Sequence, residues 1–184
     1  MFKLLVRVFV GVLAGIGVLT VAAVIWLVSG GMSSRRNPGA VETWVAVRMR
    51  SVAMPAAARK MADPEPAGPL ALKIGLEQFA DHCAMCHGND GSGQADMGRG
   101  LYPRPPDLRG EATQSMTDGE IFHVINNGVR FTGMPAWNHA GRESWALVHF
   151  IRRLPELSKA ESDRMKTLNP KAAGEAVQPP RRSK

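Results

Sequence analysis

Residues 83–87 read Cys83-Ala84-Met85-Cys86-His87, a CxxCH pattern. Two thiols three positions apart on one turn of helix can each add to a vinyl group of the same porphyrin. The residue that follows then lies beneath the ring, with its imidazole directed at the iron. The pattern is therefore typical of covalent c-type haem attachment. It predicts that Cys83 and Cys86 hold one haem c and that His87 is a ligand of the iron.

Three other interpretations of the two cysteines are weaker. A zinc site needs two further Cys or His ligands at matching spacing, but the chain has no third cysteine and its other histidines are scattered. A thioredoxin-like CxxC follows a strand in a βαβ unit, whereas residues 72–80 have the apolar spacing of a helix. A disulfide between these cysteines would close too short a loop to add much stability.

A single histidine ligand leaves the opposite coordination position of the iron open. The segment Gly-Met-Pro at residues 133–135 is the best candidate to fill it. Both neighbours disrupt regular structure, so this methionine lies on a loop whose path the proline restricts. Such a loop can present a thioether at a defined point, and we therefore predict Met134 as the second iron ligand. Weaker candidates are Met85, Met97 and Met116.

Length and charge limit what surrounds this site. A chain of 184 residues, 45% of them hydrophobic, fits one ordinary domain with extensions. The net charge of +7 would suggest an anionic partner if the basic residues shared a face. Residues 70–156, however, hold 8 Lys or Arg against 10 Asp or Glu, so the basic excess lies in the flanking segments. We therefore expect no nucleic-acid partner.

The N-terminal segment has the properties of a membrane anchor. Residues 8–28 contain no charged side chain, and as a helix they would cross roughly 30 Å of hydrocarbon. A cleaved signal peptide has an apolar stretch of only about 7 to 15 residues before a small-residue cleavage site. Here the run is longer, and only a weak site follows at residues 28–30. We predict that residues 1–30 form a retained transmembrane anchor, with cleavage as the alternative.

Residues 31–69 are predicted to be a juxtamembrane segment and linker. Asn37 and Pro38 are suited to the N-cap and the first position of a helix. Its apolar residues recur at near-helical spacing: Val41, Trp44, Val45 and Val52. This helix either lies on the membrane surface or packs on the soluble domain, and the sequence favours neither. Residues 62–69, ADPEPAGP, predict a stiff extended linker that ends at the domain boundary.

The C-terminal segment is expected to lie outside the folded domain. Residues 157–184 are basic and poor in large apolar groups, and they end in QPPRRSK. We predict a short frayed helix followed by disorder.

Five segments resemble class I cytochromes c: CAMCH, HGNDGSG, PRPPDL, TDGEIFHVINNGVRFTGMPAW and SWALVHFIRRL. They are most similar to small bacterial haem domains like those in haem c subunits of terminal oxidases. The resemblance covers about residues 70–154. It implies a haem domain at residues 70–156 with an all-α fold, in which three main helices surround the haem.

The three helices are expected at definite places. The first runs from about Leu70 into the CxxCH turn. The second starts at Thr117, where Thr-x-x-Glu forms a capping box, and stops at residues 127–128. The third runs over residues 141–154. In the resembling family the first and last helices cross closely, and we expect Gly75 to pack near Trp145 or Phe150.

The loop between the first two helices is expected to cover one face of the haem. A backbone carbonyl of residues 104–106 is predicted to accept the ring N–H of His87, which would fix the tautomer of the imidazole. Pro105 is the first choice for this acceptor. Arg104 either pairs with a haem propionate or is an ordinary solvated arginine. The histidines at 123 and 149 are expected to be ordinary helix residues, and His82 to be exposed rather than a ligand.

Iron held by histidine and methionine has no free position for oxygen or peroxide, and a neutral thioether raises its potential. We therefore expect a single-electron carrier rather than an enzyme, anchored through residues 8–28 in a bacterial inner membrane with its haem domain on the periplasmic side. Its donor would be a quinol-oxidising complex or a dehydrogenase, and its acceptor a terminal oxidase. Two alternatives stay open: a bound haem c subunit of an oxidase or dehydrogenase, and a haem enzyme whose Met134 detaches to admit peroxide or a gas.

A domain of about 85 residues buries a small core and is marginal by itself, so the haem is expected to supply missing apolar contacts. The double variant Cys83→Ala, Cys86→Ala, which cannot attach haem, is therefore expected to be largely unfolded. Circular dichroism of the haem-free variant measures this. A near-native helical spectrum would contradict the prediction.

Overall fold

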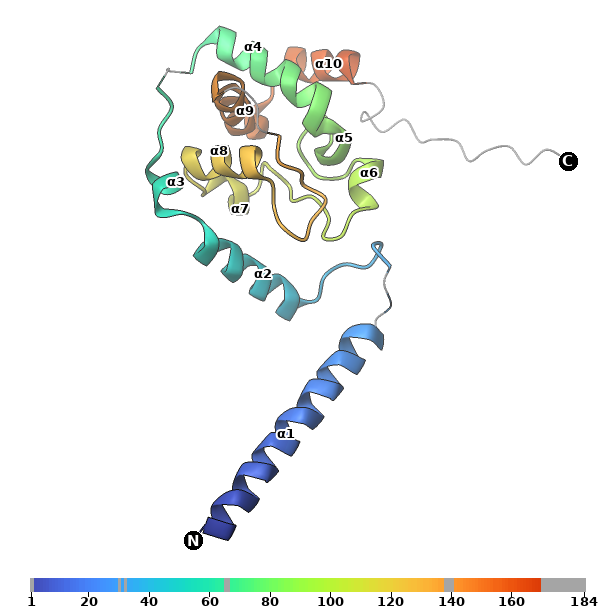
Figure 1. Ribbon diagram of the computed structural model, residues 1–184. Helices are drawn as coiled ribbons and strands as arrows, with labels where there is room; N and C mark the ends of the chain where they lie inside the picture. Colours follow the sequence, from blue (N-terminus) through green and yellow to red (C-terminus); the bar gives the residue numbers. More distant parts are fainter. Residues whose placement is uncertain (1, 30, 32, 65–66, 138–140, 170–184) are drawn as a thin grey trace, which may run out of the picture. The chain divides into compact units, whose positions relative to one another are not determined.

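The computed structural model describes residues 2–29, 31, 33–64, 67–137 and 141–169 (Figure 1). Within these ranges the chain is helical or irregular and has no strand, which confirms the predicted all-α class. The chain divides into two compact units, residues 1–33 and 34–184, and each is described by itself.

Helix α1 (Phe2–Ser29) makes up the first unit. Among the described residues it is the one helix long and apolar enough to cross a membrane. Its 25 residues up to Trp26 measure about 38 Å, more than the hydrocarbon thickness of a bilayer. Apolar side chains cover it on all sides, and Phe9 and Leu19 are 63% and 71% exposed. These properties agree with the predicted anchor.

The second unit contains the remaining helices. In chain order they are α2 (Ala40–Ala53), α3 (Ala56–Lys60), α4 (Pro69–Gln78), α5 (Ala84–His87), α6 (Asp96–Arg99), α7 (Glu111–Gln114), α8 (Asp118–Asn127), α9 (Gly141–Arg153) and α10 (Lys159–Leu168). A π-helical turn at Phe79–Cys83 joins α4 to α5, and a 3-10 turn at Leu154–Glu156 follows α9. Helices α4, α8 and α9 lie where the sequence predicts the three main helices.

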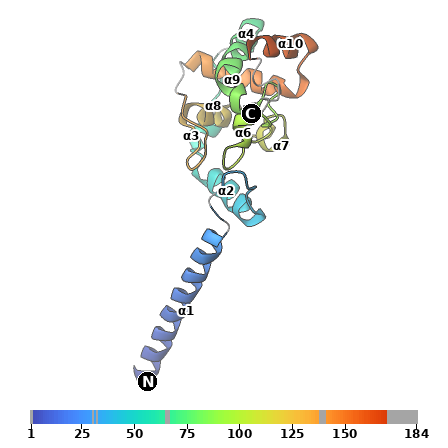
Figure 2. The ribbon, with the colours of Figure 1, turned by 90° about the vertical axis from the view of Figure 1, so that its right-hand side faces the viewer.

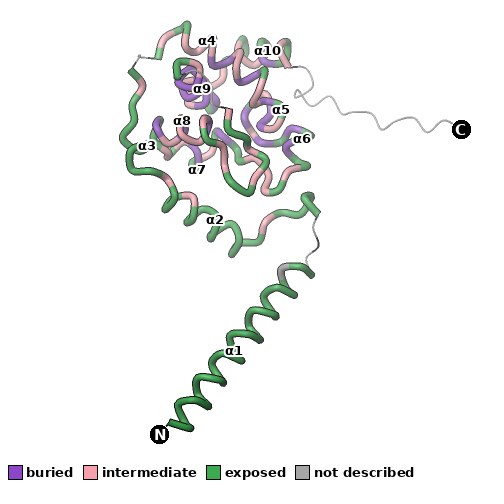
Figure 3. The backbone as a smooth tube through the Cα atoms, viewed as in Figure 1, coloured by how far each residue is buried: buried purple, intermediate pink, exposed green. Residues whose placement is uncertain are grey.

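The packing of α4 against α9 forms the centre of this unit (Figures 1 and 2). The backbones touch at Gly75, where a Cβ atom would lie only 2.1 Å from the carbonyl oxygen of Ala146 and 2.8 Å from Cβ of Phe150. One turn further on, Phe79 packs on Phe150 with ring centroids 5.3 Å apart. Both rings are almost fully buried, and Figure 3 shows much of α9 coloured as buried. The expected contact between Gly75 and Phe150 is confirmed.

Helix α8 begins as its sequence predicts. The Thr117 hydroxyl accepts a hydrogen bond from the Glu120 N–H, and the Glu120 carboxylate accepts one from the Thr117 N–H, so the capping box is complete. The helix then packs on α9 through Phe122 and Trp145, whose stacked rings have centroids 4.4 Å apart. This contact packs α8 against the α4–α9 pair.

Helix α2 starts later than predicted. Gly39, not Asn37, is its N-cap, and Pro38 lies outside the helix. Gly39 is extended and provides no side-chain cap, so the polar cap that Asn37 offered is not used. None of the residues of α2 is buried.

Residues 55–63, which we call the strap, pack on the helical domain although the sequence places them in the juxtamembrane segment and linker that precede it. Ala58 in α3 is only 2% exposed. Its carbonyl oxygen lies where a side chain at Gly119 would begin, 2.1 Å from the position of a Cβ atom. The strap can approach α8 this closely only because residue 119 is glycine.

An ion pair and a short polar contact hold the strap at its middle and its end. The Arg59 guanidinium donates to the Glu120 carboxylate on α8 at 3.1 Å. Asp63 lies 2.6 Å from Nε2 of His149 on α9, and both side chains are largely buried. His149 is therefore more than the ordinary helix residue expected, because it connects the strap to the central helix pair.

The folded domain also continues beyond residue 156, where the sequence predicts a tail. Ser158 and Glu161 form a second complete capping box that starts α10. The pattern Ser-x-x-Glu is visible in the sequence, but the expected frayed helix rests on the scarcity of large apolar residues. A frayed helix was expected, and a capped one is found.

Packing explains why α10 belongs to the domain. Met165 is fully buried in the core. The Asn169 side chain donates to the carbonyl oxygen of Ala80 at 3.1 Å. The backbone carbonyl of Asn169 accepts a hydrogen bond from the Asn89 side chain at 2.9 Å. Buried Met165 and these two hydrogen bonds help to attach the segment beside the CxxCH turn. The predicted disorder over residues 170–184 lies outside the described residues.

The close approach at Gly75 yields a test. Gly75→Ala is expected to destabilise the domain by about 3 kcal/mol or more, because the added methyl group overlaps a backbone carbonyl that cannot rotate away. Gly141→Ala is the matched control, since a Cβ atom there meets nothing within 4 Å. Thermal unfolding of the two variants measures the difference. Equal stability of both would contradict the crossing described here.

Candidate haem site

The CxxCH turn is placed by the helix that the α4–α9 crossing fixes. Phe79, buried against α9, opens the π-helical turn, and Cys83 closes it. The chain continues directly as α5, which ends after His87 because Gly88 adopts φ +80°. The two cysteines are partly buried free thiols and form no disulfide. The chain therefore presents both sulfurs and the imidazole from a single turn.

Both thiols are held in the neutral form. Burial raises the pKa of Cys83 to about 12, with a smaller contribution from the charge of Cys86. Burial also raises the pKa of Cys86. A zinc site requires deprotonated thiolates, and the described residues contain no group of three His, Cys, Asp or Glu able to hold a metal ion. An apolar environment of this kind suits thiols that add to the vinyl groups of a porphyrin.

The imidazole of His87 is in the state that a metal ligand needs. The residue is 8% exposed, and burial lowers its pKa, so the ring is neutral at neutral pH. The Pro106 backbone carbonyl acts in the opposite direction and raises the pKa. Among the described residues no group makes a well-formed hydrogen bond to the buried Nδ1 atom. A buried ring N–H needs an acceptor, and a backbone carbonyl that accepts from Nδ1 leaves the other ring nitrogen of His87 for a metal.

The glycine-rich loop brings residues 104–106 up to His87. The Gly93 N–H donates to the His87 carbonyl at 2.7 Å. The Pro105 carbonyl oxygen lies 2.4 Å from where a Cβ atom of Gly93 would be, so these two backbones touch. The carbonyl beside the imidazole is that of Pro106. Pro105 as the acceptor stays a prediction. Pro106 lies within the same predicted segment, residues 104–106, but was not the first choice.

Arg104 is partly buried, and its Nε atom is enclosed without a hydrogen-bond partner among the described residues. Its Nη2 atom donates to the carbonyl of Arg35 at 3.4 Å, which is a weak contact. A guanidinium N–H that is buried and unpaired fits an anion better than it fits solvent. A haem propionate is such an anion. The pairing of Arg104 with a propionate therefore stays a prediction that this geometry supports.

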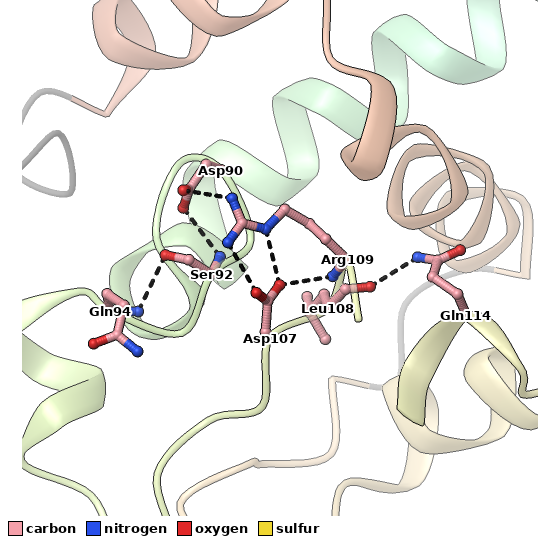
Figure 4. A network of polar contacts seen from close by, with 7 residues as sticks. All are labelled: Asp90, Ser92, Gln94, Asp107, Leu108, Arg109 and Gln114. Carbon is pink, nitrogen blue, oxygen red and sulfur yellow. Dashed lines mark hydrogen bonds and ion pairs between the residues drawn. The ribbon is translucent and has the colours of Figure 1, made fainter. Parts of the chain in front are cut away.

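A polar network centred on Arg109 lies at the far end of the same loop (Figure 4). Arg109 donates to Asp107 at 2.8 and 2.9 Å and to Asp90 at 3.0 Å. Its hydrogen bonds lower the pKa of Asp107. Gln114 donates to the Leu108 carbonyl at 2.7 Å and also to Ile151 on α9. These contacts tie the two ends of the loop together and fix the loop to the helix pair.

The predicted methionine ligand lies on a loop folded tightly on the end of α8. Gly128 has φ +66°, and a Cβ atom there would lie 2.7 Å from the Met134 carbonyl oxygen. The Val129 N–H donates to that same oxygen at 3.1 Å, and the Trp137 N–H donates to the Ile125 carbonyl at 3.1 Å. Backbone hydrogen bonds therefore hold both ends of the loop in place.

Thr132 connects the two sides of this loop. Its hydroxyl donates to the Val129 carbonyl at 2.8 Å and accepts from the Met134 N–H at 3.1 Å. Gly133 lies against the Leu101 side chain, 2.8 Å from the position of its missing Cβ atom. The methionine loop thus touches the glycine-rich loop that carries Arg104 and Pro105. Thr132 was missed from the sequence, where a threonine two residues before the methionine gives no distinct signal.

The weaker methionine candidates have other surroundings. Met85 and Met97 are 46% and 54% exposed, whereas Met116 packs against the core. His82 is partly buried, with its ring 4.9 Å from that of Trp137, so it is less exposed than expected. His139 lies outside the described residues.

The residues present fit a haem c. Two neutral thiols and a buried neutral imidazole share one turn, an unpaired guanidinium N–H lies on the adjacent loop, and a restrained methionine loop touches that loop. The helical fold and this arrangement of residues agree with the resemblance to class I cytochromes c, and an apolar N-terminal helix precedes them. Residues 70–151 match the family model described as cytochrome C oxidase, cbb3-type, subunit III. The match includes all the predicted site residues but covers less than half of the chain, and no curated protein matches the chain.

The role of Thr132 can be tested. Thr132→Val keeps the shape of the side chain but removes both hydrogen bonds, each worth about 1 kcal/mol. We expect the ferric protein to lose its far-red sulfur-to-iron absorption band at a lower urea concentration than the wild type. Thr132→Ser retains the hydroxyl and is expected to behave like the wild type. A valine variant as resistant as the serine variant would show that the hydroxyl does not hold the loop.

Proposed function

We propose that the chain is a membrane-anchored monohaem c-type cytochrome that carries single electrons between redox proteins. The observation that carries this proposal is the CxxCH turn, where two neutral thiols adjoin a buried neutral imidazole. The match to a haem c family supports electron transfer in general terms. The number of haems, the ligands and the partners are part of the proposal.

Each site residue has a defined task in this function. Cys83 and Cys86 would bind the porphyrin through thioethers, and His87 and Met134 would be the protein ligands of the iron. The haem supplies the one-electron change. The chain holds both iron ligands in place in either state, so little reorganisation accompanies electron transfer. Arg104 would neutralise a propionate, and the carbonyl of Pro105, or of its neighbour, would orient the imidazole.

The N-terminal helix supports a membrane location for this activity. With α1 in a bacterial inner membrane and the haem domain on the periplasmic side, the domain would stay at high local concentration near membrane-bound partners. The proposed donor is a quinol-oxidising complex or a periplasmic dehydrogenase, and the proposed acceptor is a terminal oxidase.

A second candidate is a bound subunit rather than a shuttle. The matched family is itself described as an oxidase subunit, which favours this reading. Purification in mild detergent separates the two, because a subunit brings its complex with it and a carrier is recovered alone. The optical spectrum of the purified protein tests the site at the same time. A low-spin ferric form with the far-red band supports the carrier, and a high-spin form supports a ligand-binding enzyme instead.

The second ligand can be tested by substitution. Met134→His is expected to keep six-coordinate iron and to lower the midpoint potential markedly, because imidazole stabilises the oxidised metal better than a thioether does. Potentiometric titration measures the change. Met97→Leu and Met116→Leu are the controls and are expected to leave the potential near that of the wild type. An unchanged midpoint in the Met134 variant would move the ligand to one of those two positions.

A further inference from the structure

Helix α2 carries an apolar stripe that its own domain leaves uncovered. Positions 41, 44, 45, 48 and 52 share one face at helical spacing. We call these residues the α2 stripe: Val41, Trp44, Val45, Arg48 and Val52. Its apolar members are exposed, with Val52 at 87%, Val41 at 70% and Trp44 at 62%. Isolated exposed apolar residues are ordinary, but a continuous face of them marks a contact surface.

Two hydrogen bonds that join α2 to the rest of its unit involve residues outside the α2 stripe. The Glu42 carboxylate accepts a hydrogen bond from the Tyr102 hydroxyl, and the Ser51 carbonyl accepts one from Arg59 of the strap. Neither residue belongs to the α2 stripe, and Glu42 lies 100° round the helix from Val41. Polar groups therefore connect α2 to the domain, while the apolar side chains of the α2 stripe stay exposed.

The length of the preceding chain limits what this face can meet. Ten residues, 30–39, separate the end of α1 from the start of α2, and a chain of that length spans at most about 35 Å. With α1 in the membrane, α2 cannot move far from the bilayer surface. The nearest extensive apolar phase is always the acyl region of that bilayer.

The charges near the α2 stripe favour lipid over protein. Arg48 lies in the middle of the stripe, with its guanidinium 5.9 Å from the centre of the Trp44 ring. A charge buried in a protein–protein contact needs a partner group that offsets its lost hydration. At a membrane surface, by contrast, arginine reaches the headgroups while its stem and the indole lie deeper. Arg35 and Arg36 precede the helix and add attraction to anionic lipid.

We infer that α2 lies in the headgroup layer of the membrane that holds α1, with the α2 stripe facing the acyl chains of an anionic bilayer. This rests on the membrane anchorage in the proposed function but not on the identity of the iron ligands. The contacts of Glu42 and Ser51 then hold the haem domain close to the surface rather than free at the end of a tether.

Hydrogen–deuterium exchange of the full-length haem protein tests this. The protein is placed in nanodiscs of phosphatidylcholine and phosphatidylglycerol with one chain per disc. Val41→Glu puts a charge on the stripe, and Thr43→Glu puts the same charge in the same helical turn but off the stripe. We expect the amides of α2 to exchange about tenfold more slowly in the wild type and in Thr43→Glu than in Val41→Glu.

The outcomes are distinct. Equal exchange of α2 in all three proteins would overturn the inference. Slow exchange that needs two chains per disc would mean a second copy covers the face, and slow exchange that needs an added redox protein would mean a protein partner does; both contradict lipid binding. The haem spectrum of each sample is recorded in parallel. A missing haem signal with normal α2 protection would count against the proposed function alone.

Discussion

Backbone contact between α4 and α9 at Gly75 is the constraint on which the rest of the domain depends. Because no side chain separates the helices there, Phe79 and Phe150 meet one turn later and close the core. The π-helical turn starts at Phe79, so the position of the cysteines follows from the crossing. The haem site is thus set by a packing contact outside it.

Burial gives the site its chemical character. The same loss of solvent that raises the pKa of Cys83 lowers that of His87, so both groups are neutral at neutral pH. Neutral thiols and neutral imidazole suit a porphyrin edge and its metal. Hydrogen bonds in the two covering loops, through Arg109 on one side and Thr132 on the other, keep that environment closed.

Local signals explain what the sequence predicts well. The capping box at Thr117 and the apolar spacing of α9 act within a few residues, and both helices form where expected. The CxxCH turn is also a local pattern. The strap and α10 depend instead on pairs far apart in the chain, such as Asp63 with His149 and Asn169 with Ala80. No periodicity within a segment reveals such partners, and a proline-rich or basic composition argues against them.

The strap also decides which bonds bear mechanical load. Along the backbone, tension from the N-terminal side reaches α4 only through residues 55–63, which are clamped to α8 and α9 by the Arg59–Glu120 ion pair, the Asp63–His149 contact and buried Ala58. Helix α4 begins only after this clamp. A pull along the leading segment therefore loads these contacts before it loads the turn that carries Cys83 and Cys86.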